Sequence, residues 1–249
     1  MIAGRRVLVA GGSSPIGSVI ARELAARGAS VAVHYRTRRS EAEEVLISLP
    51  RSAPHAALGA DLTIPGALAE ALVQVEATWG APVTDVVNAA WPSHGTGPLS
   101  STTAADLETA FQGVRMHVGL IQASIERLRR SRGSLVLLGG ALASRHHPGL
   151  ALFGAAKAAA TVLSQALALE EGSHGVRSNV LALGRVDIGD GDLAETDPVF
   201  SSLDRIGALR RALPLPAPAD VARLTAWLLS TEASAVTGQV IAVAGGEPV

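Results

Sequence analysis

The chain has 249 residues, 48% of them hydrophobic and only 3% aromatic, with a formal net charge of −1 at pH 7 and no cysteine. This balance excludes a disordered or fibrous chain, a basic surface for nucleic acid, disulfides and thiolate metal sites, and no run is long enough to span a bilayer. We therefore expect one soluble, cytoplasmic domain over residues 1–249 that binds a small molecule, with no nucleic-acid or membrane partner.

Apolar strand-like runs alternate with helical patterns along the whole chain. The expected strands are residues 5–10, 30–34, 55–59, 85–88, 134–138, 177–183 and 239–243. The expected helices carry apolar residues at three- and four-residue spacing and cover 16–27, 41–49, 67–79, 106–129, 153–171 and 220–229. Thr103 with Asp106 is a start signal for the fourth helix, and Pro65 is expected one residue into the third. Strict alternation predicts an α/β fold, a Rossmann-like, doubly wound parallel sheet of about seven strands flanked by helices.

Residues 184–215 interrupt this alternation with glycines, prolines and several acids. The composition predicts a long loop with a short helix. Loops of this length in compact α/β domains are usually lids or binding loops, because ligands sit beyond the carboxyl ends of the strands. A merely solvated loop is the alternative interpretation.

A glycine-rich turn joins the first strand to the first helix, with the sequence AGGSSPIG over residues 10–17. Gly11 permits a tight turn and Gly17 permits close packing of the helix. Pro15 has no N–H for a phosphate, although proline is well tolerated at the first position of a helix. The turn therefore predicts a diphosphate site at a helix N-terminus, and a glycine-rich turn without a ligand is the alternative.

Three arginines, Arg36, Arg38 and Arg39, follow the second strand, where the adenosine ribose of a dinucleotide would lie. No acid accompanies them to accept from a 2′-hydroxyl, and guanidinium groups suit a 2′-phosphate. This arrangement favours NADP(H) over NAD(H). The alternatives are a solvated basic face and a site that binds no nucleotide at all.

Several motifs in register resemble those of the short-chain dehydrogenase/reductase family, in particular the 3-oxoacyl-carrier-protein reductases. AGGSSPIG resembles the family's TGxxxGxG loop, VNAA at 87–90 resembles its NNAG strand end, and NVLALG at 179–184 resembles its N-x-x-x-P-G turn. The resemblance covers the entire chain and implies a single NAD(P)-binding domain. It implies that the nucleotide is held by Gly11, Ser13, Ser14, Ile16, Gly17, Arg36, Asp61, Leu62, Asn88 and Lys157.

The same resemblance implies that most of the family's catalytic side chains are missing. The position of the family's tyrosine is Phe153, and the lysine four residues later is kept as Lys157. The serine position falls on the pair Gly139-Gly140, and the helix asparagine matches Gly113. Related enoyl reductases place their tyrosine where this chain has Leu150. Phenylalanine has no ionisable proton and cannot act as a general acid or base, so ordinary carbonyl reduction should be severely impaired.

Other residues could supply the missing acid or base. His94 follows the fourth strand and His146 the fifth, on the side where substrate would lie, although loop histidines are more often solvated. His117 reads as a packing or interface residue. A largely apolar substrate pocket is expected to be lined by Trp91, Gly140, Leu142, Phe153 and Arg185.

Three functions remain open. The first is an oxidoreductase-like enzyme that binds NADP(H) and acts on a small apolar carbonyl or hydroxyl compound with a non-standard active site. The second is a non-redox enzyme that reuses the pocket for a cyclisation, dehydration or isomerisation. The third is a silent subunit paired with an active homologue. The resemblance implies a homodimer or homotetramer, or such a hetero-oligomer, through helices 106–129 and 153–171.

Overall fold

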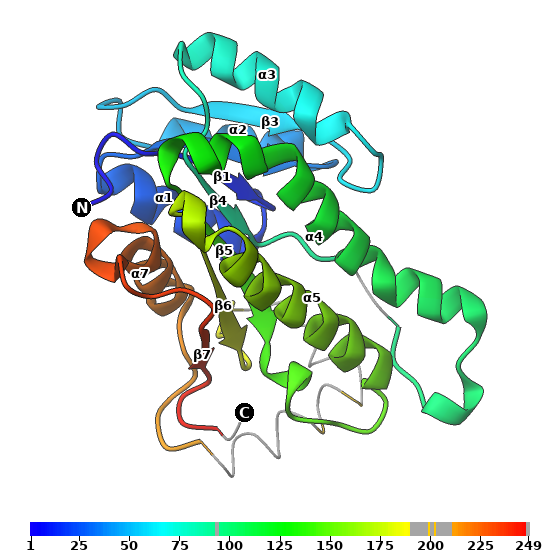
Figure 1. Cartoon of the computed structure of the whole chain (residues 1–249). Coiled ribbons are helices and arrows are strands. Elements are labelled where there is room, and N and C mark those ends of the chain that lie inside the picture. The colour runs from blue at the N-terminus through cyan, green and yellow to red at the C-terminus, as the bar shows by residue number, and fades with distance from the viewer. Residues whose placement is uncertain (93–94, 190–198, 200–201, 203–210, 248–249) are drawn as a thin grey trace.

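The computed structural model describes the chain apart from residues 93–94, 190–198, 200–201, 203–210 and 248–249. Seven parallel strands form one sheet in the order β3-β2-β1-β4-β5-β6-β7 (Figure 1). The strands are β1 (Arg6–Ala10), β2 (Ser30–Tyr35), β3 (Ala56–Gly59), β4 (Asp85–Asn88), β5 (Ser134–Gly140), β6 (Arg177–Leu183) and β7 (Val240–Val243). The direction of winding reverses between β1 and β4, which is where a crevice opens in sheets of this kind.

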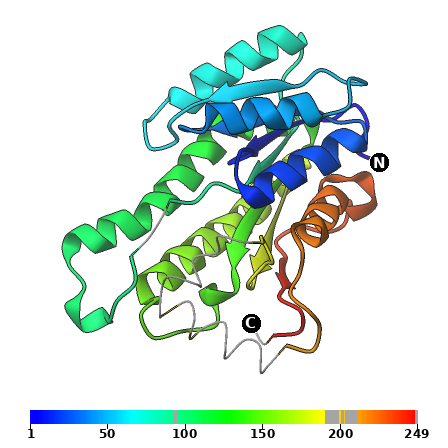
Figure 2. The same ribbon diagram turned by 180° about the vertical axis from the view of Figure 1, so that it is seen from behind.

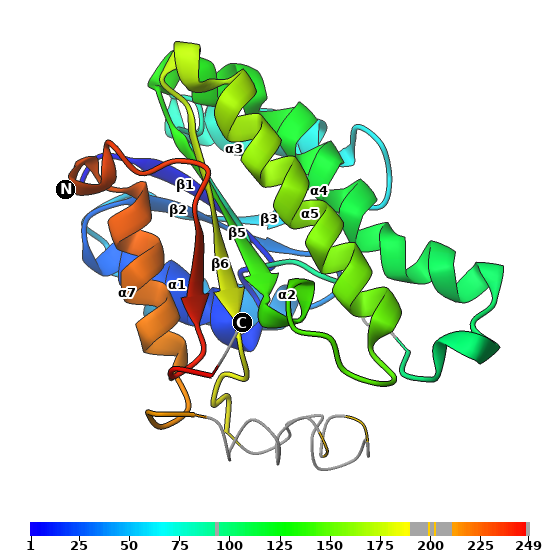
Figure 3. The ribbon, with the colours of Figure 1, turned by 60° about the horizontal axis from the view of Figure 1, so that its bottom comes forward.

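Helices cover both faces of the sheet (Figure 3). One layer holds α1 (Pro15–Ala26), α2 (Arg39–Ser48) and α7 (Pro218–Leu229), which lie in front in Figure 2. The opposite layer holds α3 (Ala67–Trp79), α4 (Ala104–Ser131) and α5 (Ala151–Glu170). The expected Rossmann-like fold is thus confirmed.

The sheet separates two apolar cores because successive side chains of a strand point to opposite faces. In β1, Val7 and Val9 join the core under α1 and α7, whereas Leu8 and Ala10 join the core under α3, α4 and α5. All four are fully buried. Strands covered on both faces need apolar residues at every position, which explains their continuous runs of valine, leucine and alanine.

Of the two predicted helix start signals, one is confirmed and one is wrong. Thr103 and Asp106 form a reciprocal capping box, with the Thr103 Oγ1 accepting from the Asp106 N–H at 3.2 Å. The prediction for Pro65 was wrong, because α3 begins after Gly66, which takes the left-handed φ of 84° that glycine favours. Most of the loop expected at 184–215 lies outside the described residues.

Helix α5 is long and apolar enough, by length and composition, to cross a membrane, contrary to the expectation that no run would be. In this structure it packs on β5, β6 and α4 as part of a helical layer. Core helices of α/β domains pass the same test, because alanine and leucine fill both their buried and their outward faces.

Candidate nucleotide and catalytic site

A groove of about 440 Å³ crosses the carboxyl ends of β2, β1 and β4. The predicted nucleotide residues that line it are Gly11, Ser13, Ser14, Arg36 and Leu62. Three loops that are distant in the sequence meet here, because the carboxyl ends of parallel strands share one edge of the sheet. The groove therefore coincides with the position expected for a dinucleotide.

The glycine loop has no room for side chains at two positions. Gly11 has φ +76°, and a Cβ there would lie 2.8 Å from the Ala89 carbonyl oxygen. A Cβ on Gly17 would overlap the carbonyl oxygen of Gly11. The Oγ of Ser14 caps α1 by accepting from the Gly17 N–H at 3.1 Å, with Pro15 at the first helical position. Ile16 packs against the core beneath the loop.

His34, on β2, holds this loop in place, and sequence reasoning missed that role. Its Nδ1 accepts from the Gly11 N–H at 2.9 Å, and its Nε2 lies 3.0 Å from the Ala60 carbonyl oxygen. Since a backbone N–H can only donate, the proton must sit on Nε2, which donates to Ala60. Burial lowers the pKa of His34 to about 4, so the ring is neutral near pH 7. The available signal was a histidine that follows the apolar run Val31-Ala32-Val33 within the same strand.

The end of the groove at β2 is basic. Arg36 and Arg38 both line it. Arg39 lies outside the groove lining and pairs with Glu43 one helical turn later in α2, with Nε 2.7 Å from Oε1. The carboxylate of Asp61 accepts from the Thr63 N–H and Oγ1 at 2.9 and 2.7 Å, and these bonds hold its pKa below the usual range. The carboxylate is therefore held in place within its own turn and stays ionised.

Asn88 directs its side chain into the protein. Its Nδ2 donates to His117 Nδ1 at 3.0 Å, and its Oδ1 accepts from the Ala90 N–H at 3.1 Å. His117 is fully buried and its Nε2 donates to Ser164 Oγ at 2.9 Å. Burial, with a smaller effect of the Lys157 charge, lowers the pKa of His117 to about 4. The packing interpretation of His117 is confirmed, and the network ties the end of β4 to α4 and α5.

Lys157 lies beside this network and is only 5% exposed. Its Nζ donates to the Leu138 carbonyl oxygen at 3.1 Å, lies 3.8 Å from the centroid of the Trp91 ring and 5.5 Å from that of Phe153. Burial lowers the pKa of Lys157 to about 7. The aromatic faces and the carbonyl act in the opposite direction, because they stabilise the ammonium.

Of the glycines at the expected serine and asparagine positions, only Gly140 lies beside the same lysine. A Cβ on Gly140 would lie 3.6 Å from the Cγ of Lys157, in ordinary contact. A Cβ on Gly139 would lie 2.6 Å from the Cγ1 of Val180, so Gly140 is the member of the pair that faces Lys157. Gly113 lies against Trp91, whose Cε2 would be 2.5 Å from a Cβ there. The structure thus brings Trp91, Gly140, Phe153 and Lys157 together.

The remaining predicted residues are more dispersed. Leu142 is buried in the 3-10 turn (Ala141–Ala143) after β5, and Arg185 is half-buried after β6. His146 is exposed in the segment that follows that turn. His94 lies outside the described residues. The structure therefore places no histidine among the groups that enclose the Lys157 ammonium in the described part of the chain.

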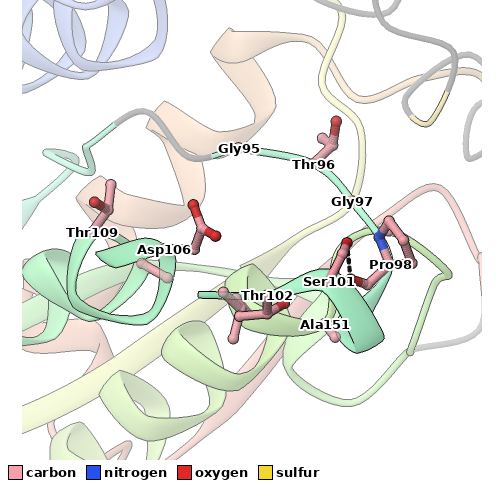
Figure 4. Close-up of a pocket in the computed structure, with 12 residues that line it drawn as sticks. Gly95, Thr96, Gly97, Pro98, Ser101, Thr102, Asp106, Thr109 and Ala151 are labelled. Atoms are coloured by element: carbon pink, nitrogen blue, oxygen red, sulfur yellow. Dashed lines mark hydrogen bonds between the residues drawn. The ribbon is translucent and has the colours of Figure 1, made fainter. Parts of the chain in front are cut away.

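A second, smaller hollow of about 130 Å³ lies between the loop at 95–98 and the first turns of α4 and α5 (Figure 4). Asp106, Thr109 and Ala151 line it, and the Gly97 N–H donates to the Gly149 carbonyl oxygen at 3.0 Å across it. Its lining includes Ala151 and Leu152, the two residues before Phe153. Hydroxyl groups and the Asp106 carboxylate contribute to its lining, whereas two aromatic rings face the Lys157 ammonium.

The sequence is similar to known proteins along nearly its whole length. Residues 10–247 match the family model of enoyl-(acyl carrier protein) reductase. The chain is 33% identical over 203 residues to inactive 2-(S)-hydroxypropyl-CoM dehydrogenase 2 of Xanthobacter autotrophicus, across 76% of this chain and 83% of that protein. It is 29% identical over 249 residues to hydroxynaphthalene reductase arp2 of Aspergillus fumigatus, across 96% and 90%. A solved short-chain dehydrogenase of Burkholderia cenocepacia in complex with NADP superposes with a TM-score of 0.84 at 28% identity, across 100% and 99%.

Proposed function

The chain belongs to the short-chain dehydrogenase/reductase family, a family of oxidoreductases, and on that premise we propose that it binds NADP(H) and acts on a small apolar carbonyl or hydroxyl compound through a non-standard active site. The observation that carries the proposal is the groove across β2, β1 and β4, with a helix N-terminus on one wall and arginines at one end. A solved relative holds NADP. A bound nicotinamide would exchange a hydride with the substrate, and the chain would supply binding and orientation.

The preference for a 2′-phosphate rests on Arg36 and Arg38. Both arginines line the groove, and residues 34–38 include no acid that could accept from a ribose 2′-hydroxyl. Guanidinium groups bind phosphate through two parallel hydrogen bonds, a geometry that an uncharged ribose cannot match. The N-terminus of α1 lies at the groove, and the positive end of its dipole suits the diphosphate.

A titration of the purified protein with NADPH and NADH tests this proposal, with nucleotide fluorescence and thermal stabilisation as readouts. The wild type should bind NADPH at least tenfold more tightly than NADH. The double variant Arg36→Ala/Arg38→Ala should lose about a hundredfold in NADPH affinity and little in NADH affinity, since phosphate contacts are removed. Arg39→Ala, which removes a guanidinium outside the groove, is the matched control. Equal affinity of all variants for NADPH would refute the assignment.

The chemistry around Lys157 supports an unusual mechanism. An ammonium at Lys157 can donate to a ribose hydroxyl, but Phe153 offers no proton and Gly140 no hydroxyl to orient a carbonyl. Leu150 is buried and equally unable to serve as the tyrosine of enoyl reductases. The acid or base for this proposal would have to come from outside the cluster formed by Trp91, Gly140, Phe153 and Lys157, and His146 and His94 remain the proposed sources.

The same cluster favours a second proposal, a non-redox enzyme or a silent subunit. A relative that is 33% identical is itself named inactive. Installing the missing groups by Phe153→Tyr with Gly140→Ser separates the alternatives. A rise of at least tenfold in NADPH-dependent reduction of a carbonyl panel would support a redox ancestry that only lacks these groups. No rise, with NADPH still bound, would favour the non-redox or silent role.

We also propose that α4 and α5 form the contact with a second subunit. Their outward faces carry exposed apolar side chains: Val162 is 62% exposed, Leu169 86% and Leu107 46%. A subunit contact through these helices would cover these side chains. Light scattering should therefore give the mass of a homodimer or homotetramer, and Val162→Glu should reduce it to that of a monomer. A monomeric wild type that captures an active homologue would support the hetero-oligomer instead.

A further inference from the structure

Trp91 stands at the end of the groove that is farthest from Arg36. It follows β4 by three residues, whereas Arg36 follows β2, and β1 lies between these two strands. The described lining of the groove includes Trp91 and Met116 but neither Lys157 nor Phe153. The indole therefore separates the groove from the lysine.

The indole and Gly113 fit each other closely. The six-membered ring of Trp91 lies against the α carbon of Gly113, so that a Cβ at this position would be 2.5 Å from Cε2 and 2.6 Å from Cζ2. Any larger residue at 113 would displace the ring. Trp91 follows β4 and Gly113 lies in α4. The indole fills the space that a side chain at position 113 would otherwise take.

Lys157 is satisfied by this closed arrangement. One N–H of the ammonium donates to the Leu138 carbonyl oxygen, and the charge faces the π-surface of Trp91 at 3.8 Å. With only 5% of the residue exposed, a sugar hydroxyl in the groove cannot reach Nζ unless the indole leaves. Moving the indole breaks the buried cation–π contact between Lys157 and Trp91. The free energy of that contact is therefore subtracted from the affinity of any ligand that requires the movement.

We propose that Trp91 closes the nicotinamide end of the groove, so that the resting protein recognises mainly the adenosine 2′-phosphate half of its ligand. This inference deepens the proposed NADP(H) site and rests on it. The half that carries the 2′-phosphate lies at Arg36 and Arg38, on the far side of β1, and does not require the indole to move. The nicotinamide half gains its contacts with Lys157 only after displacing Trp91, and its net contribution to affinity is correspondingly small.

Calorimetric titration with 2′,5′-ADP and with NADPH measures the two halves separately. The wild type should bind them within about threefold of each other. Trp91→Ala should tighten NADPH about tenfold, since the cost of displacing the indole is gone, and leave 2′,5′-ADP within twofold. Gly113→Ala keeps the tryptophan, but the added Cβ displaces its ring from the resting position. This variant should therefore also bind NADPH more tightly than the wild type, and its tryptophan fluorescence should be quenched more strongly by acrylamide. Gly119→Ala, on the same helix with open space around it, is the matched control.

Three results would overturn the inference. If the wild type binds NADPH more than thirtyfold tighter than 2′,5′-ADP and Trp91→Ala weakens NADPH, the indole supports the nicotinamide instead of excluding it. If neither Trp91→Ala nor Gly113→Ala changes NADPH affinity beyond twofold, the indole is not a barrier, and Gly113→Ala decides this even where Trp91→Ala fails to fold. If the wild type binds neither ligand, the proposed NADP(H) site fails and this inference fails with it.

Discussion

Acidification should destabilise the protein through His34, because this residue must stay neutral to hold the glycine loop. The Nδ1 that accepts from the Gly11 N–H becomes a second donor when the ring is protonated. Since His34 is only 3% exposed, burial prevents solvent from compensating the lost bond. Protonation thus breaks the link between β2 and the loop that we propose binds the diphosphate. Nucleotide binding and stability should decline together.

The magnitude follows from the pKa of His34, about 4 in the folded protein against 6.5 for the free side chain. Between these values the unfolded chain binds more protons than the folded chain, so stability falls as the pH is lowered. The contribution of His34 is complete above pH 6.5 and is lost progressively toward pH 4. Between pH 7.5 and pH 5.0 the linkage relation gives a loss of roughly 2 kcal/mol from this residue.

Urea unfolding followed by circular dichroism at pH 7.5 and 5.0 measures this loss. His34→Gln cannot titrate, so the difference between the two pH values should be about 2 kcal/mol smaller in this variant than in the wild type. His117 titrates in both proteins and cancels. His146→Gln, which changes an exposed side chain, should behave like the wild type. A variant at residue 34 whose pH-dependent loss equals that of the wild type would refute the reasoning.

Three further experiments test packing at the site and the contact between α3 and α4. Gly17→Ala should lower the free energy of unfolding by about 3 kcal/mol and abolish nucleotide binding, because the added Cβ overlaps the loop. Gly172→Ala, at an exposed position with open space, is the control, and thermal unfolding should show a change of no more than about 0.5 kcal/mol. Gly139→Ser should lower the free energy of unfolding by about 2 kcal/mol and Gly140→Ser by less than about 1 kcal/mol, as measured by chemical unfolding. The reverse order would show that Gly139, and not Gly140, faces the lysine. Glu76→Gln weakens the contact with Arg127 on α4, whose guanidinium donates two hydrogen bonds to the Glu76 carboxylate at 2.6 and 2.8 Å. Chemical unfolding should show that the free energy of unfolding falls by about 1 to 2 kcal/mol, with or without nucleotide.

Local patterns in the sequence determined the architecture. The alternation of apolar runs and helical periodicities identified all seven strands and the six long helices of the described chain within a few residues. The glycine loop and the capping box of Thr103 and Asp106 depend on residues at most seven positions apart. Such signals are legible in a sequence because the backbone geometry of a turn or a helix end restricts its own residues.

Only the tertiary structure decided how the site is closed. His34 reaches Gly11 across 23 positions and Ala60 across 26. Trp91, after β4, meets Gly113 of α4 and Lys157 of α5. The resemblance to the family located Lys157 and Phe153, but it did not show that an indole covers the lysine or that Gly140 is the glycine that faces it. These facts depend on side-chain directions and on the distances between elements that are remote in the chain, which no local pattern encodes.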